Sequence, residues 1–251
     1  MRVRAWRAPA FSMQQYWIPG HVRVCPLLAN TILLDLKRNR YFGIGANETR
    51  ALSTLALNWN DANGSAAPVE QLAPETAIAM ADALIEAGLL SRDPPADRTS
   101  FGAAPLDLSG VLSCAGHELN RRTSLRLAHV ASFLGALAWT RRALRSRTLY
   151  AIASEVRDRK AAAGGAFDER RAIELVGLFR RLRPHTFAAR DRCLFHSLAL
   201  VRFMARHGVF PTWVIGVRAK PWGAHAWVQQ GKLLLDAHPE QVCEYTPILT
   251  V

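Results

Sequence analysis

The sequence predicts an α+β protein built from two domains, and three observations support this prediction. Residues 20–91 contain three short runs rich in β-branched and aromatic residues, followed by two segments with helical spacing. Two prolines and three charged residues without periodicity, at 91–97, indicate a linker that we place at 92–100. Residues 101–251 show helical patterns first and strand patterns afterwards. We expect an N-terminal extension at 1–19 before these two domains.

The first domain is expected to open with three strands. The predicted strands are His21–Leu28, Thr31–Leu36 and Tyr41–Gly45, and Asn39 suits the tight turn before the third. A helix is expected at Asn47–Leu57, with Asn47 as its N-cap.

A second helix is predicted at Pro74–Ala87, because Pro and Glu occupy its first turn and Gly88 follows its end. Its expected apolar face consists of Ile78, Ala81, Ile85 and Leu89.

The second domain is expected to be helical first and to end in a sheet. Glycines and a Ser-Arg pair separate the apolar periodic segments, so several helices follow one another before the strands. The predicted helices are Arg122–Arg145, Thr148–Ala163, Phe167–Leu182 and Cys193–His207, and the predicted strands are Thr212–Val217, Ala224–Gln229 and Lys232–Asp236.

Composition limits the cellular context. A hydrophobic fraction of 50% in 251 residues can fill real cores. The longest apolar stretch, Leu127–Trp139, is shorter than a bilayer span, and no secretory h-region follows the basic start. Four cysteines without a C-x-x-C pair do not form a disulfide framework, and Cys25 and Cys114 are expected in the core. We expect a cytoplasmic protein without an integral membrane segment.

Positive charge is concentrated in one stretch of the chain. The net charge is +12, and residues 121–192 carry seventeen Lys/Arg against six Asp/Glu, whereas residues 1–95 carry nine against eight. The basic stretch suits nucleic acid, an acidic partner, an anionic membrane or simply solvated helix faces. Because the first domain is nearly neutral and therefore offers few phosphate contacts, we do not expect nucleic acid as a partner.

Three residues near the end of the chain suggest thiol chemistry. Cys193 stands in the first turn of its predicted helix, where the dipole favours a thiolate, and Asp191 suits the N-cap. His225 lies in an alternating strand beside Trp227, which suits a general base. Asp236 ends an apolar run, so it needs water or a partner such as His225. The order Cys, His, acid therefore predicts a nucleophile with an oriented base.

Residues 192–236 resemble the transglutaminase-like, papain-related cysteine peptidase of lasso-peptide maturation, the B protein of those pathways. The matching features are Cys193-Leu194, the Ser197–Leu200 segment, the Gly216-Val217 strand end, the His225–Val228 segment and Asp236. The resemblance implies that Cys193 is the nucleophile, His225 the base and then the acid, and Asp236 the group that orients the imidazole. It implies no cofactor and no metal.

Residues 20–90 independently resemble the PqqD-like peptide-recognition element, a winged helix-turn-helix. The matching stretch runs from Leu33-Leu34-Asp35-Leu36 through Tyr41-Phe42-Gly43-Ile44 to Gly88-Leu89-Leu90. The resemblance implies that a precursor's leader segment adds as a strand along Tyr41, Phe42, Gly43 and Ile44. The helix bearing Ile78 and Ile85 would form the other wall. The implied partners are the precursor peptide and an ATP-dependent lasso cyclase that closes the ring after the leader is removed.

The residues alone leave three other interpretations open. Cys193, His196, His225 and His238 are possible zinc ligands, although paired-Cys spacing is missing. The same triad is equally suited to transfer an acyl group to an amine, as in transglutaminases. A third possibility is a non-catalytic adaptor that binds peptide, with the nearly neutral first domain arguing against DNA.

Overall fold

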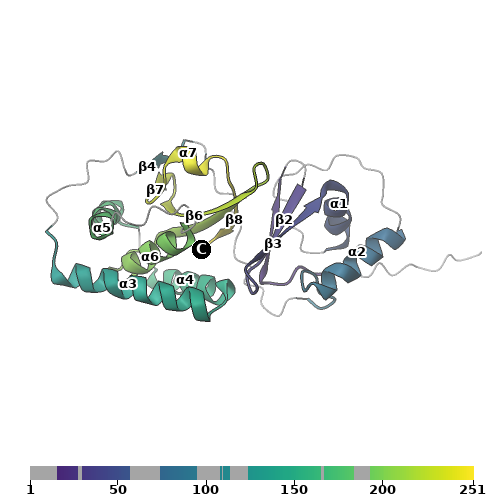
Figure 1. Cartoon of the computed structure of the whole chain (residues 1–251), viewed down its shortest axis with the longest axis horizontal. Helices are drawn as coiled ribbons and strands as arrows, with labels where there is room; N and C mark the ends of the chain where they lie inside the picture. The colour runs from purple at the N-terminus through teal and green to yellow at the C-terminus, as the bar shows by residue number, and fades with distance from the viewer. Residues whose placement is uncertain are drawn as a thin grey trace, which may run out of the picture.

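A computed structural model describes residues 16–27, 30–56, 74–94, 108, 110–113, 124–164, 167–183 and 193–251. They form two units, each with its own sheet and helices (Figure 1). We call residues 16–94 the N-terminal unit and residues 108–251 the C-terminal unit. The predicted mixed α+β architecture is confirmed.

The N-terminal unit contains an antiparallel sheet in the order β1-β2-β3. Its strands are β1 (Val22–Pro26), β2 (Asn30–Asp35) and β3 (Arg40–Gly45), as predicted to within a few residues. Asn39 adopts a positive φ of 51° in the turn before β3, a conformation that Asn tolerates. β3 pairs with β2 on one side, and within the described residues no strand pairs with its other edge.

Helices α1 (Ala46–Leu55) and α2 (Pro74–Glu86) follow the sheet. The prediction that Asn47 caps the first helix is wrong, because Gly45 is the N-cap and Asn47 lies inside the first turn, accepting a hydrogen bond from Arg50. Ala81 and Leu89 are buried, as the predicted apolar face requires, and Ile85 packs against the same core. Ile78 is 48% exposed.

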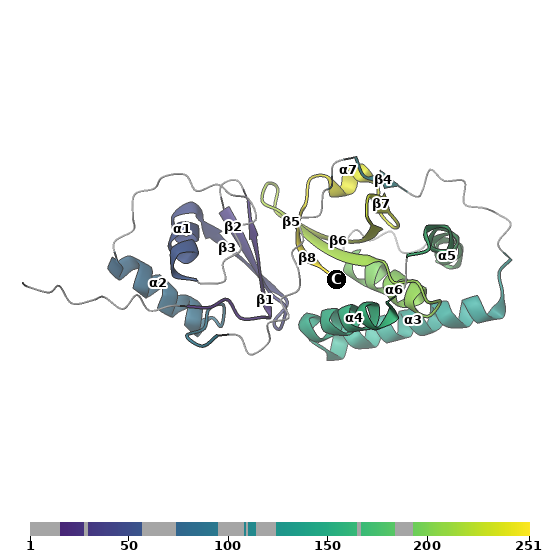
Figure 2. The ribbon, with the colours of Figure 1, turned by 180° about the vertical axis from the view of Figure 1, so that it is seen from behind.

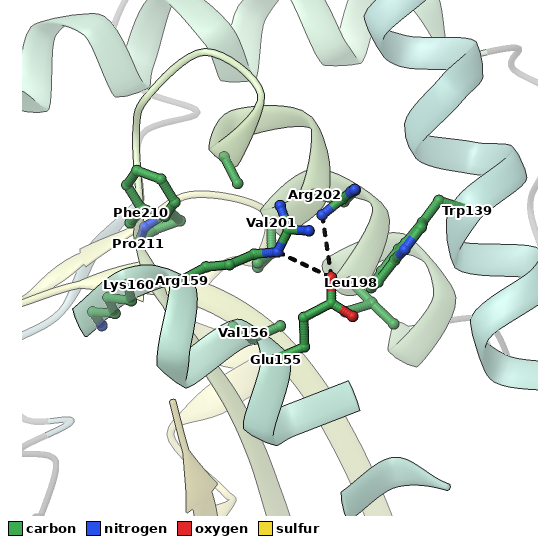
Figure 3. Close-up of a pocket in the computed structure, with 11 residues that line it drawn as sticks. Trp139, Glu155, Val156, Arg159, Lys160, Leu198, Val201, Arg202, Phe210 and Pro211 are labelled. Atoms are coloured by element: carbon green, nitrogen blue, oxygen red, sulfur yellow. Dashed lines mark hydrogen bonds and ion pairs between the residues drawn. The ribbon is translucent and has the colours of Figure 1, made fainter. Parts of the chain in front are cut away.

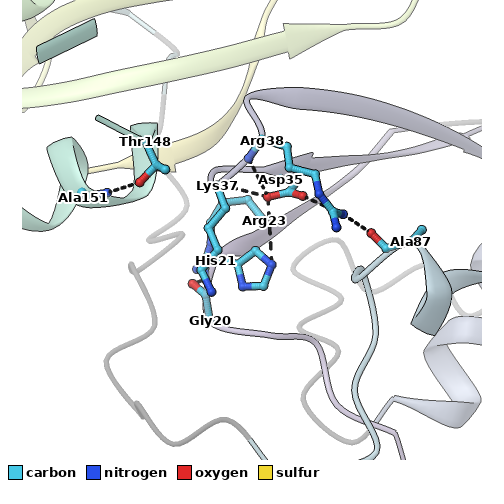
Figure 4. Close-up of polar contacts among 9 residues, drawn as sticks. All are labelled: Gly20, His21, Arg23, Asp35, Lys37, Arg38, Ala87, Thr148 and Ala151. Carbon is cyan, nitrogen blue, oxygen red and sulfur yellow. Dashed lines mark hydrogen bonds and ion pairs between the residues drawn. The ribbon is translucent and has the colours of Figure 1, made fainter. Parts of the chain in front are cut away.

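Asp35 joins the β2–β3 turn to the end of α2 (Figure 4). Its buried carboxylate accepts hydrogen bonds from the backbone N–H groups of Lys37 (2.8 Å) and Arg38 (3.1 Å), and the Arg38 guanidinium contacts it at 3.4 Å. Arg38 also donates to the carbonyl of Ala87. The ion pair and these donors satisfy a carboxylate that would otherwise be costly to bury.

The C-terminal unit places four long helices before and beside a five-stranded sheet. The helices are α3 (Leu127–Ser146), α4 (Leu149–Ala163), α5 (Glu169–Leu182) and α6 (Cys193–Ala205). The side chains of Thr148 and Asp168 cap α4 and α5 by accepting from Ala151 and Arg171, and Figure 4 shows the first of these bonds. The predicted start of α3 at Arg122 is wrong, because residues 124–126 precede the helix.

The sheet of this unit has the order β4-β7-β6-β5-β8. Three of its strands match the prediction in position, and two strands and one short helix were not predicted. The elements are β4 (Leu112–Ser113), β5 (Thr212–Arg218), β6 (Gly223–Gln230), β7 (Leu233–Leu234), α7 (Pro239–Val242) and β8 (Thr246–Thr250).

The two faces of this sheet belong to different apolar clusters. Trp213, Ile215 and Ala226 join the large core that contains the buried residues of α6. Val214 and Trp227 join a smaller cluster with Val242 of α7. Alternate residues of β5 and β6 therefore face α6 and α7 in turn, as the strand period of two requires.

The two units share a core as well as a chain. Figures 1 and 2 show β1 and β8 facing each other across the boundary, in agreement with their contacts. Cys25, Ile32 and Leu34 of the N-terminal sheet pack into the large core of the C-terminal unit. The prediction that Cys25 is a core residue is confirmed, whereas Cys114 lies outside the described residues. In the described segments, no helix has both the length and the apolar character needed to cross a membrane.

Candidate active site

Cys193 is the first residue of α6, as predicted from the sequence. It is a free, half-buried thiol that packs against the large core. The predicted N-cap, Asp191, lies outside the described residues. The helix start gives Cys193 a position near unpaired backbone N–H groups, which favour negative charge.

The helix that carries Cys193 is fixed to the sheet by a buried hydrogen bond. The indole Nε1 of Trp213 on β5 donates to Ser197 Oγ at 2.9 Å, and both side chains are fully buried. Leu198 and Val201, one and two turns along α6, are also buried. Ser197 lies one helical turn after Cys193, so this bond sets the distance of the thiol from the strands.

His225 lies near the start of β6 and pairs in register with Gly216 of β5. Its ring is stacked on Trp227, with centroids 5.9 Å apart and planes at 20°, and lies 5.5 Å from the ring of Tyr245. Burial lowers the pKa of His225 from its ordinary value of 6.5. The imidazole is therefore neutral at physiological pH, the form that can accept a proton.

Gly216 makes room for this aromatic arrangement. A Cβ at this position would lie 2.7 Å from the Trp227 ring and 3.0 Å from Cβ of Tyr245, closer than carbon atoms approach without a shift. A glycine beside His225 therefore lets the indole lie flat against β5. The sequence resemblance included Gly216 without giving this reason for it.

Asp236 follows β7 and turns back to β6. Its Oδ1 accepts the backbone N–H of Val228 at 2.7 Å. Although part of the residue is exposed, burial of the carboxyl group raises its pKa to about 7, and the Val228 bond and the charge of Arg180 only partly offset this effect. Arg180 of α5 also donates to the neighbouring carbonyl of Leu235 at 3.1 Å.

The structure places His225 on β6 and Asp236 against the backbone of β6, but it does not join all three predicted side chains. His225 shares its side of β6 with Trp227, whereas Cys193 packs against the cluster that contains Ala226 and Val228. Within the described part of the chain, no hydrogen bond or ion pair links Cys193, His225 and Asp236. The regular β5–β6 register causes this separation, because neighbouring residues of a strand point to opposite faces.

The zinc arrangement considered from the sequence is not assembled. Among the described residues, which include Cys193, His196, His225 and His238, no group of three or more His, Cys, Asp or Glu side chains could hold a metal ion.

A separate small cavity of about 20 Å³ lies between α3, α4 and α6 (Figure 3). Glu155 of α4 stands at its wall and accepts contacts from Arg159 at 3.0 Å and Arg202 at 3.4 Å, and also from Arg147. The Arg202 guanidinium lies 4.6 Å over the Trp139 ring. Neither Cys193, His225 nor Asp236 lines this cavity. Some of the arginines that make these helices basic therefore form ion pairs with the single carboxylate of Glu155.

A comparison with protein families assigns the region that contains Cys193, His225 and Asp236 to a known superfamily. Residues 131–250 match the model described as the transglutaminase-like superfamily, so this part of the chain is a transglutaminase-like domain. The match runs from α3 to β8 and includes Cys193, His225 and Asp236. Searches of curated proteins and of solved structures return no match. A domain of this superfamily suggests cysteine-peptidase or transglutaminase-type chemistry.

Proposed function

We propose that this protein is a cysteine peptidase that removes the leader from a ribosomally synthesised precursor, as in lasso-peptide maturation. One observation carries the proposal. A transglutaminase-like domain holds a free thiol at the first residue of a buried helix, a histidine follows on β6, and an aspartate after β7 binds the backbone of β6. The order and residue types match those of a thiol nucleophile with an oriented base.

In this mechanism Cys193 attacks the carbonyl carbon of the scissile peptide bond. His225 takes the thiol proton and returns it to the leaving amine as the C–N bond breaks, which leaves a thioester on Cys193. Water deprotonated by His225 then hydrolyses the thioester and frees the thiol. The lowered pKa of His225 supplies the neutral base that the first step needs.

Catalysis requires His225 to move from its stack with Trp227 and Tyr245 to the thiol. Catalytic contacts in a free enzyme are often long and tighten only when substrate binds. We therefore propose that binding of the precursor brings the start of β6 and the helix start together. Asp236, bound to Val228 of the same strand, would then orient the imidazole.

The N-terminal unit is proposed to bind the leader along the open edge of β3. Gly43 of this strand is exposed, and the side chains of Phe42 and Ile44 pack against the N-terminal core. An added strand would therefore gain backbone hydrogen bonds more than new apolar contact. The exposed Ile78 of α2 offers an apolar contact for a leader side chain, and Ile85 is already partly buried. The ATP-dependent cyclase is the proposed consumer of the released core peptide.

The test is cleavage of a leader–core peptide from a short reading frame beside this gene, followed by mass spectrometry. Cys193→Ala and His225→Ala should abolish cleavage while leader binding persists. Cys243→Ala is the matched control, because Cys243 is also a free thiol but is exposed at the end of α7. Retained cleavage by the Cys193→Ala protein would exclude the proposed mechanism.

Acyl transfer to an amine is the second candidate, because the transglutaminase-like match covers that chemistry equally. The same thioester would be attacked by an amine instead of water. Adding a primary amine to the cleavage reaction separates the two, since an amide of the N-terminal fragment indicates transfer and a free acid indicates hydrolysis.

A further inference from the structure

Tyr41 of β3 reaches across the boundary between the two units. Its ring lies 5.5 Å from that of Trp222, with the planes at 69° in an edge-to-face contact. Trp222 stands in the β5–β6 turn, three residues before His225, and is 53% exposed. An aromatic side chain of the proposed leader-binding strand therefore touches the hairpin that carries the proposed base.

Tyr41 packs into the same large core as Cys193. Phe42, the next residue of β3, packs instead against the core of the N-terminal unit. Burial raises the pKa of Tyr41 to about 12, and the charge of Cys193 adds to this effect. The phenol is therefore un-ionised and within electrostatic range of the thiol.

The two units are held in one arrangement by contacts beside this site. The backbone N–H of Tyr150 on α4 donates to the carbonyl of Leu36, directly after β2, at 2.9 Å. Leu34 and Leu36 are fully buried in the core shared with α4 and α6. Packing therefore fixes the position of the N-terminal sheet relative to α4 and α6.

We infer that Tyr41 and Trp222 form one wall of the peptide path between the β3 edge and Cys193. The pair would contact the residues of the substrate just before the scissile bond and so act as specificity-determining residues. This inference rests on the proposed function, and it makes the N-terminal unit part of the active site as well as a site of attachment.

The proposed path favours one direction for the bound peptide. Tyr41 is the second residue of β3, and Gly45 is its last. A peptide paired antiparallel to β3 runs from the Gly45 end to the Tyr41 end, so its C-terminal end emerges beside Cys193. Because the leader precedes the core, this direction delivers the scissile bond by the shortest route.

A labelling experiment tests the wall without any substrate. Cys193 is alkylated with iodoacetamide and, separately, with a polyethylene-glycol maleimide, and its modification is followed by peptide mass mapping. In Tyr41→Ala and Trp222→Ala, the bulky reagent should react about fivefold or more faster, while iodoacetamide changes by less than about twofold. Tyr41→Phe and Trp222→Phe keep an aromatic ring at each position and should stay close to wild type. Trp222 is largely exposed, so its variant remains informative if Tyr41→Ala does not fold. Unchanged bulky labelling in folded alanine variants would overturn the inference.

A substrate experiment tests the fixed path. Two residues, Gly-Ser, are inserted in the precursor between its β3-binding segment and the scissile bond. We expect cleavage to fall about tenfold, because misplacing the bond costs orientation, while affinity for the leader stays unchanged. Equal cleavage of both peptides would refute a fixed path. Absence of cleavage of the original precursor would instead count against the proposed function, and the labelling result would still decide whether the wall exists.

Discussion

The carboxyl group of Asp236 should make the stability of this protein depend on pH in a direction opposite to that of most carboxylates. Burial raises its pKa to about 7 from the ordinary value of 3.8, so the folded protein holds this proton more tightly than the unfolded chain does. Such a group stabilises the fold fully below its unfolded pKa, and the stabilisation is lost as pH rises through the folded value.

The perturbation is Asp236→Asn, which removes the titration and keeps an oxygen that can accept the Val228 N–H. A shift of about three pKa units corresponds to roughly 4 kcal/mol in total, an upper bound because the residue is partly exposed. As the pH rises from about 5 to about 8, linkage lowers the free energy of unfolding of wild type by about 2.5 kcal/mol relative to that of the variant.

The assay is urea denaturation of both proteins at several pH values across this range. Subtracting the variant from wild type cancels other groups that titrate there, including His225, whose lowered pKa acts in the opposite direction. The difference in free energy of unfolding should grow as pH rises and level off above about pH 8. A difference that stays constant over this range would show that Asp236 is already ionised in the fold, and the reasoning from its burial would be refuted.

Three further predictions follow from individual contacts. Ser197→Ala leaves the buried indole N–H of Trp213 without its acceptor, so the free energy of unfolding measured in urea should fall by about 1–3 kcal/mol. A fall of less than about 0.5 kcal/mol would show that the bond does not anchor α6. Gly216→Ala places a Cβ against Trp227 and should lower the free energy of unfolding by about 1–3 kcal/mol, with loss of the near-ultraviolet circular dichroism of the indole. A variant of unchanged stability and unchanged spectrum would contradict this prediction. The rate of Cys193-dependent cleavage should fall on the acid side with a midpoint below pH 6.5, because burial lowers the pKa of His225. Trp227→Ala removes a ring that buries His225, so this midpoint should move to higher pH. A midpoint that does not move would exclude His225 as the titrating base.

The strands and long helices were predictable because their signals are local. The apolar run at 212–217, the alternation at 224–229 and the apolar spacing of α6 come from short windows of sequence, and these elements appear within a residue or two of the expected bounds. The placement of Cys193 at the helix start followed from the same periodicity. The N-cap of α1 was predicted wrongly at Asn47 because several polar residues precede the apolar spacing, and only the fold places Gly45 at the cap.

The elements that were missed depend on partners distant in sequence. β8 contains Pro247, which reads as a strand breaker, yet a strand at the edge of a sheet tolerates proline where no ladder bond is needed. β4 has two residues and exists only through its pairing with β7. The contact between Tyr41 and Trp222 joins positions 181 residues apart, and no local pattern signals it.

One hairpin connects the parts of the candidate site that the structure leaves apart. β5 and β6 carry Gly216 and His225 at paired positions, and the turn between them carries Trp222, which touches Tyr41 of the N-terminal unit. A peptide that presses on Trp222 therefore acts on the strand that holds the imidazole, only three residues away. Among the described residues no ion pair holds the stack of His225 on Trp227 and Tyr245, so its aromatic contacts oppose release by only about 1 kcal/mol for each pair. The β5–β6 pairing that keeps His225 on this face must also open at the start of β6. Opening this end of the hairpin exchanges its internal contacts for contacts with the bound peptide, and this exchange is how we propose that the imidazole reaches the thiol once substrate is bound.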